Sequence, residues 1–317
     1  MALVFFVEKK DRKKRMVQDY KYLNEWTIKN NYPLPLISEV LENVAMKKVF
    51  TKMDLRWEYN NVRIKEGDEW KAVFTTPEGF FEPMVMFFGL TNLPATFQAM
   101  MNELLRDLIN TGKVAVFIDD VIIGMEMEKG HDEIVAEVIR RLEENDLYVK
   151  LEKCKQKIWE VGFLEVVIGP EGIKMEKEKM REVLKWLIPK CVKDVQKFLG
   201  LANHYRQFIQ SFVSIVKLLH NMVKKDRKWE WTEKQERAFE ELKRRFIQEL
   251  VLAAPDLDKK MRMEVDTSDY ATGGVLSMEE EGKWKLVTFL SKLLNKTERN
   301  YKIHDKKMLA IIRGLES

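Results

Sequence analysis

The sequence contains few cysteines and no long apolar run. Of its 317 residues two are cysteines, Cys154 and Cys191, and their separation fits neither a zinc-ligand spacing nor a disulfide framework. A reducing compartment is therefore expected. The apolar run at the start, Leu3–Val7, is too short for a signal peptide or a membrane span, so we expect no membrane partner. We also find no internal repeat and no low-complexity linker.

Charge of one sign is not in large excess either. The formal net charge of +4 is too small to indicate a nucleic-acid partner by itself, although basic residues cluster locally, as in Lys9–Arg15. Hydrophobic residues make up 45% and charged residues 33% of the chain, which is typical of a soluble globular protein. The length allows two or more domains with cores of their own.

Strand-like and helix-like segments alternate along the first half of the chain. Val49–Leu55 is predicted to be a strand that ends beside an acid, and Pro94 opens a helix whose apolar residues keep helical spacing. A turn is expected at Gly169–Gly172. This alternation predicts one α+β domain over residues 1–170.

The second half changes character twice. Residues 171–254 are charged and mostly helical, and Thr232 with Gln235 fits a capping box at the start of one helix. Strand patterns return in residues 255–317, which end in a predicted helix. We therefore expect three domains, with boundaries near residues 170 and 254.

Two adjacent carboxylates, Asp119 and Asp120, interrupt a strongly apolar stretch. A buried carboxylate needs a cation or several donors to stay ionised, and two adjacent ones repel each other, so a divalent metal ion would suit the pair. Taken alone, however, the pair is better explained as a solvated turn of a β-hairpin. Asp54 offers a third acid at the end of a strand. If the two strands are neighbours, three carboxylates converge on a two-metal site suited to nucleotidyl transfer.

Four long motifs follow one another along the chain: Phe50–Arg56, Arg63–Lys71, Phe88–Gln98 and Phe117–Asp120. They occur in the order found in reverse transcriptases of Ty3/Gypsy-type LTR retrotransposons, and the chain is similar to this family over nearly its whole length. Val195–Asn203 resembles the connection region, and Asp266–Ala271 resembles the start of the RNase H domain. The resemblance implies a right-hand polymerase palm and fingers, a helical thumb and connection, and a truncated α/β RNase H-like domain.

The resemblance implies a catalytic site for two Mg²⁺ ions, with Mn²⁺ as an alternative. Asp54, Asp119 and Asp120 match the catalytic metal ligands, and the carbonyl of Leu55 matches an additional ligand. Tyr59 matches the aromatic residue that excludes a ribose 2′-hydroxyl and so favours dNTPs. Without the resemblance, Tyr59 would be interpreted as a core aromatic.

Further residues match the nucleotide and primer sites of the family. Lys9 and Arg15 match cationic finger residues that meet the triphosphate, although a solvated basic turn explains them too. Phe88 and Gly89 match the lining of the dNTP pocket.

The match continues beyond the nucleotide pocket. Lys153 matches the lysine that protonates pyrophosphate. Phe163 and Leu164 match the primer grip. The lysines and aromatics of residues 153–230 fit phosphate contacts along a duplex, and a solvated helical face explains most of them equally well.

Several positions depart from the family pattern. Trp57 and Glu58 stand where small residues are usual, so we expect them to disturb Asp54 or to raise neighbouring carboxylate pKa values. Phe87 replaces a proline. Glu165 replaces a glycine that we expect to need unusual backbone freedom.

The RNase H-like region departs most. Lys307 stands where the family has a metal-binding Glu, and the chain ends before the remaining acids. Asp266 is left as one ligand of an incomplete set, so we expect RNase H activity to be lost.

The sequence thus predicts an RNA-directed DNA polymerase that extends a primer on an RNA or DNA template with dNTPs. The expected location is the cytoplasm, with a virus-like particle or the nucleus as alternatives. A rival interpretation is a catalytically dead or co-opted remnant that binds nucleic acid without synthesis. An RNA-templated RNA polymerase is disfavoured by Tyr59 and by the RNase H-like segment.

Overall fold

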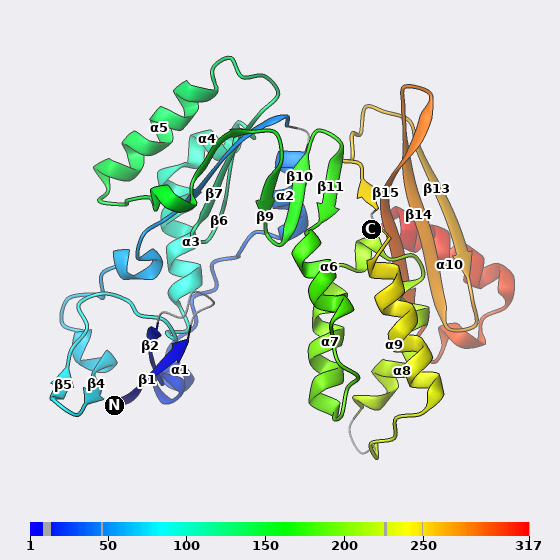
Figure 1. Cartoon of the computed structure of the whole chain (residues 1–317), viewed down its shortest axis with the longest axis horizontal. Coiled ribbons are helices and arrows are strands. Elements are labelled where there is room, and N and C mark those ends of the chain that lie inside the picture. The colour runs from blue at the N-terminus through cyan, green and yellow to red at the C-terminus, as the bar shows by residue number, and fades with distance from the viewer. Residues whose placement is uncertain (9–13, 46, 225–226, 249, 317) are drawn as a thin grey trace. The chain divides into compact units, whose positions relative to one another are not determined.

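The computed structural model describes residues 1–8, 14–45, 47–224, 227–248 and 250–316. The chain divides into two compact units, Met1–Phe163 and Leu164–Ser317, and each combines β-sheets with helices (Figure 1). None of the described helices has both the length and the apolar character that a membrane span requires.

The first unit contains two four-stranded sheets. The N-terminal sheet has the strand order β2-β1-β4-β5 and consists of β1 (Ala2–Glu8), β2 (Lys14–Gln18), β4 (Phe74–Thr76) and β5 (Gly79–Phe81). The central sheet has the order β6-β7-β3-β8 and consists of β3 (Val49–Asp54), β6 (Val114–Phe117), β7 (Asp120–Met125) and β8 (Lys155–Ile158). The remaining elements are α1 (Lys21–Trp26), α2 (Ile37–Ala45), α3 (Leu93–Leu104), α4 (Arg106–Asn110), α5 (His131–Glu144) and β9 (Val161–Phe163).

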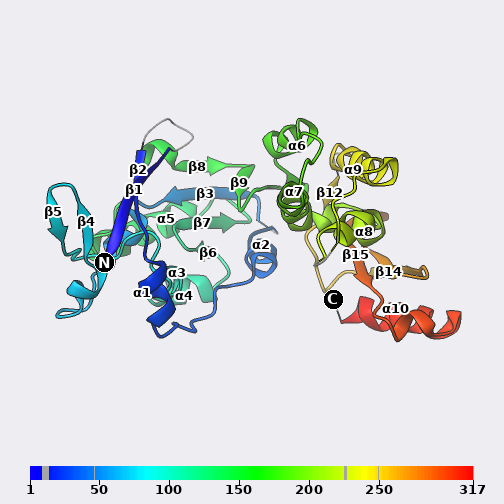
Figure 2. The ribbon, with the colours of Figure 1, turned by 90° about the horizontal axis from the view of Figure 1, so that it is seen from below.

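A large core cluster of the first unit lies on one face of the central sheet, whose strands run side by side in Figure 2. Met53 of β3 and Val121 and Ile123 of β7 pack with Phe97 of α3 and Val138 of α5. Each of these side chains is at least 98% buried. Because side chains alternate between the two faces of a strand, the residues next to them in sequence point to the opposite face, where the predicted acids lie.

The described residues of the second unit form two small sheets and five α-helices. Strands β10 (Val166–Gly169), β11 (Gly172–Met175) and β12 (Val251–Leu252) are antiparallel neighbours. The second sheet has the order β13-β14-β15, with β13 (Met261–Thr267), β14 (Ala271–Glu280) and β15 (Lys283–Leu293). The helices are α6 (Lys177–Leu184), α7 (Val192–His204), α8 (Phe212–Met222), α9 (Glu233–Phe246) and α10 (Ile303–Leu315).

Aromatic side chains hold the helices of the second unit together. Phe198 of α7 and Phe239 of α9 are both buried, with ring centroids 4.6 Å apart. The predicted capping box at the start of α9 is confirmed, since Thr232 accepts a hydrogen bond from the backbone of Lys234 and donates its own backbone N–H to Gln235. The predicted division into three domains, with boundaries near residues 170 and 254, stays a prediction.

Candidate active site

Two acids from distant parts of the sequence lie opposite each other in the central sheet. Strands β3 and β7 are antiparallel, and their register runs from Val49 opposite Met125 to Asp54 opposite Asp120. Directly opposed residues in an antiparallel pair have Cβ atoms about 4.5–5.5 Å apart and share a face of the sheet. The carboxylates of Asp54 and Asp120 are therefore neighbours on the face opposite Met53 and Val121.

The third acid lies in the tight turn between β6 and β7. Phe117 pairs with Asp120, so Ile118 and Asp119 form a two-residue hairpin turn, as one of the two sequence interpretations predicted. The carbonyl of Asp119 accepts a hydrogen bond of 3.3 Å from the backbone of Leu55. Leu55 directly follows Asp54, so this bond ties the turn to the end of β3.

The backbone of this turn is strained and is held by a buried amide. Ile118 has a φ of 56°, a region that a β-branched residue rarely adopts and that is often found at functional sites. Gln98 of α3 is fully buried. Its Oε1 accepts a hydrogen bond of 2.7 Å from the backbone of Ile118, and its Nε2 donates to the carbonyl of Val116 at 3.2 Å and to Asn102 at 2.8 Å. Gln98 therefore fixes the backbone on both sides of Phe117.

Lysine side chains compensate the charge of the two opposed acids. Asp54 forms ion pairs with Lys150 at 2.6 Å and with Lys153 at 3.1 Å, and Asp120 forms one with Lys52 at 3.0 Å. Burial of the Asp54 carboxyl raises its pKa, but the hydrogen bonds from the two lysines outweigh burial, so the pKa lies below its usual value. Asp54 is thus ionised at neutral pH.

Sequence reasoning found Lys153 but missed Lys52, Lys150 and Gln98. Lys52 carried a signal, since it lies two residues before Asp54 in one strand and so shares its face. A weaker signal existed for Gln98, a polar residue within the apolar stripe of α3. Nothing in the local sequence marks Lys150, because its role depends on the fold that brings it to Asp54.

The carboxylates are suitable ligands for a divalent cation, but their side chains are not arranged around a common point in this structure. Within the described parts of the chain, no three His, Cys, Asp or Glu side chains are placed to hold a metal ion as they stand. Instead, ammonium groups lie against the carboxylates of Asp54 and Asp120. Carboxylate oxygens are the ligands that Mg²⁺ prefers. A metal ion at this site would therefore take over oxygens that the lysines now contact.

Three residues of the predicted dNTP pocket form one aromatic stack. The Arg15 guanidinium lies 4.3 Å from the centre of the Phe88 ring. The ring of Tyr59 meets Phe88 edge-on at 5.0 Å and Phe97 of the core at 5.8 Å. Arg15 comes from β2, so the stack joins the N-terminal sheet to the core under the central sheet.

Gly89 needs its lack of a side chain. Its φ is 102°, and a Cβ there would lie 3.1 Å from the carbonyl of Gln18. Its own carbonyl accepts a hydrogen bond of 2.6 Å from Asn24. Lys9, the other cation predicted for the pocket, lies outside the described residues.

The departures from the family pattern are accommodated in different ways. Trp57 has a φ of 55° and a side chain that is 69% exposed, while Asp54 keeps its place opposite Asp120. The side chain of Glu58 is not among the described ones. Phe87 packs edge-on against Phe74 with ring centroids 6.1 Å apart, which extends the small core of the N-terminal sheet.

The segment predicted as a primer grip joins the two units. Phe163 is buried in β9, and Leu164 and Glu165 follow with φ values of 50° and 66°. The positive φ of Glu165 is the unusual backbone expected where the family has a glycine. The carbonyl of Glu165 accepts a hydrogen bond of 3.0 Å from Tyr205, whose pKa is raised by burial and by Glu165.

The acid predicted in the second unit has different surroundings. Asp266 of β13 pairs in register with Gly273 of β14. The nearby Asp269 forms an ion pair with the buried Lys306 of α10 at 3.5 Å. Lys307 is exposed on the same helix. The register therefore places no carboxylate opposite Asp266.

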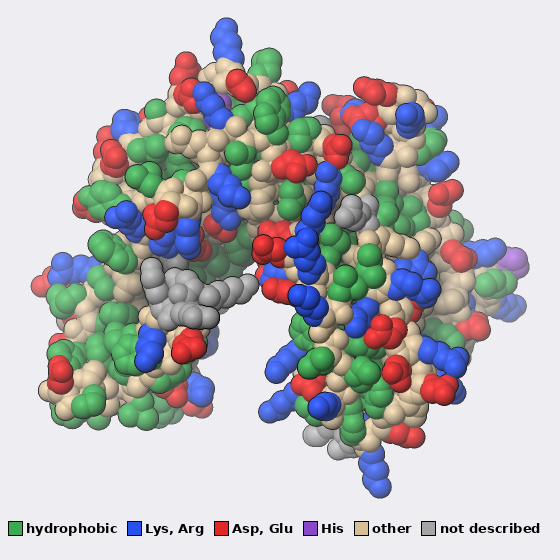
Figure 3. All heavy atoms as spheres, in the orientation of Figure 1, with side chains coloured by type: hydrophobic (Ala, Val, Ile, Leu, Met, Phe, Trp, Pro, Cys, Tyr) green, Lys and Arg blue, Asp and Glu red, His purple; other side chains and the backbone are tan. Residues whose placement is uncertain are grey.

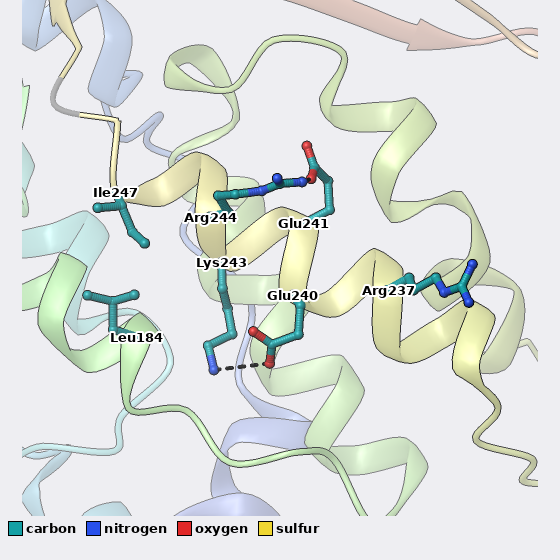
Figure 4. Close-up of a pocket in the computed structure, with 7 residues that line it drawn as sticks. All are labelled: Leu184, Arg237, Glu240, Glu241, Lys243, Arg244 and Ile247. Carbon is teal, nitrogen blue, oxygen red and sulfur yellow. Dashed lines mark hydrogen bonds and ion pairs between the residues drawn. The ribbon is translucent and has the colours of Figure 1, made fainter.

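A hollow of about 750 Å³ between α6 and α9 of the second unit is a poor candidate for a catalytic site. Figure 4 shows its lining residues, Leu184, Arg237, Glu240, Glu241, Lys243, Arg244 and Ile247. Lys243 pairs with Glu240 at 3.4 Å, and Arg244 pairs with Glu241. Basic and acidic side chains are likewise interspersed over the part of this unit seen in Figure 3.

Two family models match the chain. Residues 7–202 match "Reverse transcriptase (RNA-dependent DNA polymerase)". The chain belongs to the reverse transcriptase family. Residues 231–317 match "RNase H-like domain found in reverse transcriptase". The family membership predicted from the ordered motifs is confirmed.

Retrotransposon polyproteins are among the similar sequences. The Tf2-3 and Tf2-7 transposon polyproteins of Schizosaccharomyces pombe are each 37% identical to this reverse transcriptase-family chain over 314 residues. The alignments cover 99% of the chain but 24% of each polyprotein. The chain thus spans about a quarter of the length of these relatives.

Solved structures share the fold. A foamy viral protease-reverse transcriptase in complex with an RNA/DNA hybrid matches with a TM-score of 0.84 and 23% identity, over 99% of this chain and 42% of that one. The same viral protein in complex with double-stranded DNA matches with a TM-score of 0.88 and 24% identity, over 99% of this chain and 55% of that one. The predicted fold class, an α+β polymerase with an RNase H-like region, is confirmed.

Proposed function

We propose that the first unit carries the catalytic centre of an RNA-directed DNA polymerase of retrotransposon type. The observation that carries the proposal is the register that sets Asp54 opposite Asp120, with Asp119 in the adjoining turn. Three carboxylates on the ends of neighbouring strands suit two Mg²⁺ ions, with Mn²⁺ as an alternative. Bound there, the ions would activate a primer 3′-hydroxyl and stabilise the charge on the triphosphate.

Each residue of the site has a proposed part. Asp54, Asp119 and Asp120 hold the metal ions, and the Leu55 carbonyl is an additional ligand. Gln98 keeps the strained Ile118 turn in place, so that Asp119 and Asp120 stay close to Asp54.

The aromatic stack is the proposed dNTP pocket. Arg15, oriented by its contact with the Phe88 ring, meets the triphosphate, with Lys9 as a second cation. Tyr59 is wedged between Phe88 and Phe97, and this packing makes it a rigid wall against a 2′-hydroxyl. Gly89 lets the backbone of the pocket approach closely.

Lys153 and the primer grip complete the site. The Lys153 ammonium lies 3.1 Å from Asp54, and this position supports its proposed role of giving a proton to pyrophosphate. Phe163 and Leu164 grip the primer end. The nucleic-acid partners of the foamy viral protein named above support a template and primer as the partners of this chain.

RNase H activity is proposed to be absent. Lys307 stands where a metal-binding Glu is expected, and Asp266 lies opposite a glycine. The rival function, nucleic-acid binding without synthesis, has one supporting observation: lysines form ion pairs with the carboxylates of Asp54 and Asp120.

The test is incorporation of dTMP on poly(rA)·oligo(dT) with Mg²⁺, comparing the wild type with Asp119→Asn. We expect incorporation by the wild type and its loss in the variant. A folded wild type that binds the duplex without incorporating dTMP would establish the rival function. Activity that survives Asp119→Asn would show that the site is elsewhere.

A further inference from the structure

One lysine connects an acid of the proposed metal site to the primer-grip strand. Lys52 lies on β3 two residues before Asp54, opposite Ile122 in the register with β7. Asp120 is thus its diagonal neighbour on the same face. The Nζ of Lys52 lies 3.0 Å from Oδ1 of Asp120, with the two side chains 21% and 26% exposed.

The same ammonium also reaches β9. It donates a hydrogen bond of 3.4 Å to the carbonyl of Gly162 and lies 5.7 Å from the centre of the Phe163 ring. Both contacts are longer than the ion pair, so the Lys52 ammonium interacts mainly with Asp120. Lys52 nevertheless touches an acid of the proposed metal site and the strand that ends in the proposed primer grip.

This arrangement differs from an ordinary surface ion pair just beyond the other end of β3 and β7. Lys47 has a similar exposure, 19%, but its partner Glu126 is 71% exposed and lies 3.4 Å away. Exposed pairs of that kind contribute little. Lys52 instead faces an acid that lies beside Asp119 and opposite Asp54. Because like charges this close repel each other, a fixed positive charge there stabilises Asp120 as long as no metal ion is bound.

We propose that Lys52 is a positioning residue that holds Asp120 against β9 and competes with a divalent cation for the Asp120 carboxylate. The proposal rests on the function proposed above. Removing the ammonium should change metal affinity and catalytic rate in opposite directions. The change frees Asp120 for a metal ion, but it loosens the acid and the primer-grip strand. Metal binding should then become tighter while nucleotide transfer becomes slower.

The experiment measures Mn²⁺ binding to the full chain without nucleic acid, by the electron paramagnetic resonance signal of free Mn²⁺. We expect Lys52→Met to bind Mn²⁺ about two- to fivefold more tightly, the range expected when a partly exposed ion pair is removed. Lys47→Met is the matched control for the loss of one positive charge and should stay at the wild-type value. Lys52→Arg, which keeps the charge, should also stay close to it.

The same substitution in an Asp120→Asn variant shows whether the change in Mn²⁺ affinity acts through Asp120. In Asp120→Asn the substitution Lys52→Met should no longer change Mn²⁺ affinity, because the carboxylate for which they compete is gone. In primer extension, Lys52→Met should lower kcat about tenfold and Lys52→Arg should restore most of it. Lys52→Gln, a polar replacement, repeats the binding measurement in case the Met variant unfolds, and thermal unfolding checks both.

Unchanged or weaker Mn²⁺ binding by a folded Lys52→Met or Lys52→Gln variant would overturn the proposal. An equal gain in Lys47→Met would also overturn it, because the effect would then be one of net charge. These outcomes leave the proposed function intact as long as Asp120→Asn weakens Mn²⁺ binding. If Asp120→Asn has no effect, the metal site itself is wrong and the role of Lys52 is wrong with it.

Discussion

Asp54 in the first unit and Asp266 in the second both lie on antiparallel strands, but different residues face them. Asp54 is opposite Asp120, one residue from Asp119. Asp266 is opposite Gly273, and the neighbouring Asp269 is paired with Lys306. The first register sets two carboxylates opposite each other with three lysines around them, whereas the second sets a glycine opposite its acid.

An acid on a strand does not by itself form a metal site. The residue opposite it in the β-ladder decides, because directly opposed side chains share a face within about 5 Å. Concentrated carboxylates then need cations, either ammonium groups or metal ions. By this criterion the first unit offers opposed carboxylates at Asp54 and Asp120, whereas Asp266 of the second unit has Gly273 opposite it.

The largest expected effect contrasts the two aspartates directly. We predict that Asp54→Asn lowers dTMP incorporation on poly(rA)·oligo(dT) by about 10³-fold or more, since metal ions stabilise the transition state by several kcal/mol. Asp266→Asn should stay within about twofold of the wild type. A comparable loss from Asp266→Asn would break the distinction between the units.

The next effect concerns the choice of sugar. Tyr59→Val should raise incorporation of ribonucleotides relative to dNTPs by about 100-fold, because the wall formed with Phe88 and Phe97 is removed. Tyr59→Phe keeps the ring and is the matched control, which should still discriminate. Steady-state kinetics with dTTP and UTP on the same template measure both ratios. Equal discrimination in Tyr59→Val would place the sugar contact elsewhere.

A smaller effect is expected from the turn that carries the acid pair. Gln98→Leu should lower kcat about tenfold with little change in the KM for dNTP, because two buried hydrogen bonds to the turn are lost. Asn102→Ala is the control, since it removes the third partner of Gln98 and leaves the bonds to Val116 and Ile118. If both variants behave alike, the turn does not depend on Gln98.

The smallest effect is one of stability and pH. His131 is fully buried, and its Nε2 lies 2.7 Å from the hydroxyl of Thr51 on β3. Burial lowers its pKa below the usual 6.5 and outweighs the opposing effect of the nearby Asp132 carboxylate. As the pH falls through 6.5, the unfolded chain therefore takes up the proton first and the folded state loses stability.

The matching measurement is urea unfolding of the wild type and His131→Gln at pH values from 8 to 5. The free energy of unfolding of the wild type relative to the variant should decrease toward low pH. The decrease should level off below the pKa of His131 in the folded chain. A constant difference across the range would show that His131 keeps its ordinary pKa.

Local sequence patterns predicted the elements of the site but not their pairing. The apolar stretch around Asp119 indicated a hairpin, and Asp54 was placed at a strand end, both as the structure has them. That the two strands are neighbours was an assumption, because about 65 residues separate them and a ladder between distant segments has no local signal. The family resemblance supplied that step.

The residues around the acids were harder to predict. Lys150 meets Asp54 across 96 residues, and the strained φ of Ile118 contradicts the usual preference for glycine at such a position. Both depend on tertiary packing, which overrides local preference. Lys52 was predictable in principle, because residues two apart in a strand share a face.

The proposed metal site is tested most directly by anomalous X-ray diffraction from crystals of the chain with a primer-template and Mn²⁺. We expect anomalous peaks within ligand distance of Asp54, Asp119 and Asp120 and none beside Asp266. A peak at Asp266 without one at the first site would contradict it, as would a structure in which Lys52 and Lys150 keep their carboxylates while Mn²⁺ binds elsewhere.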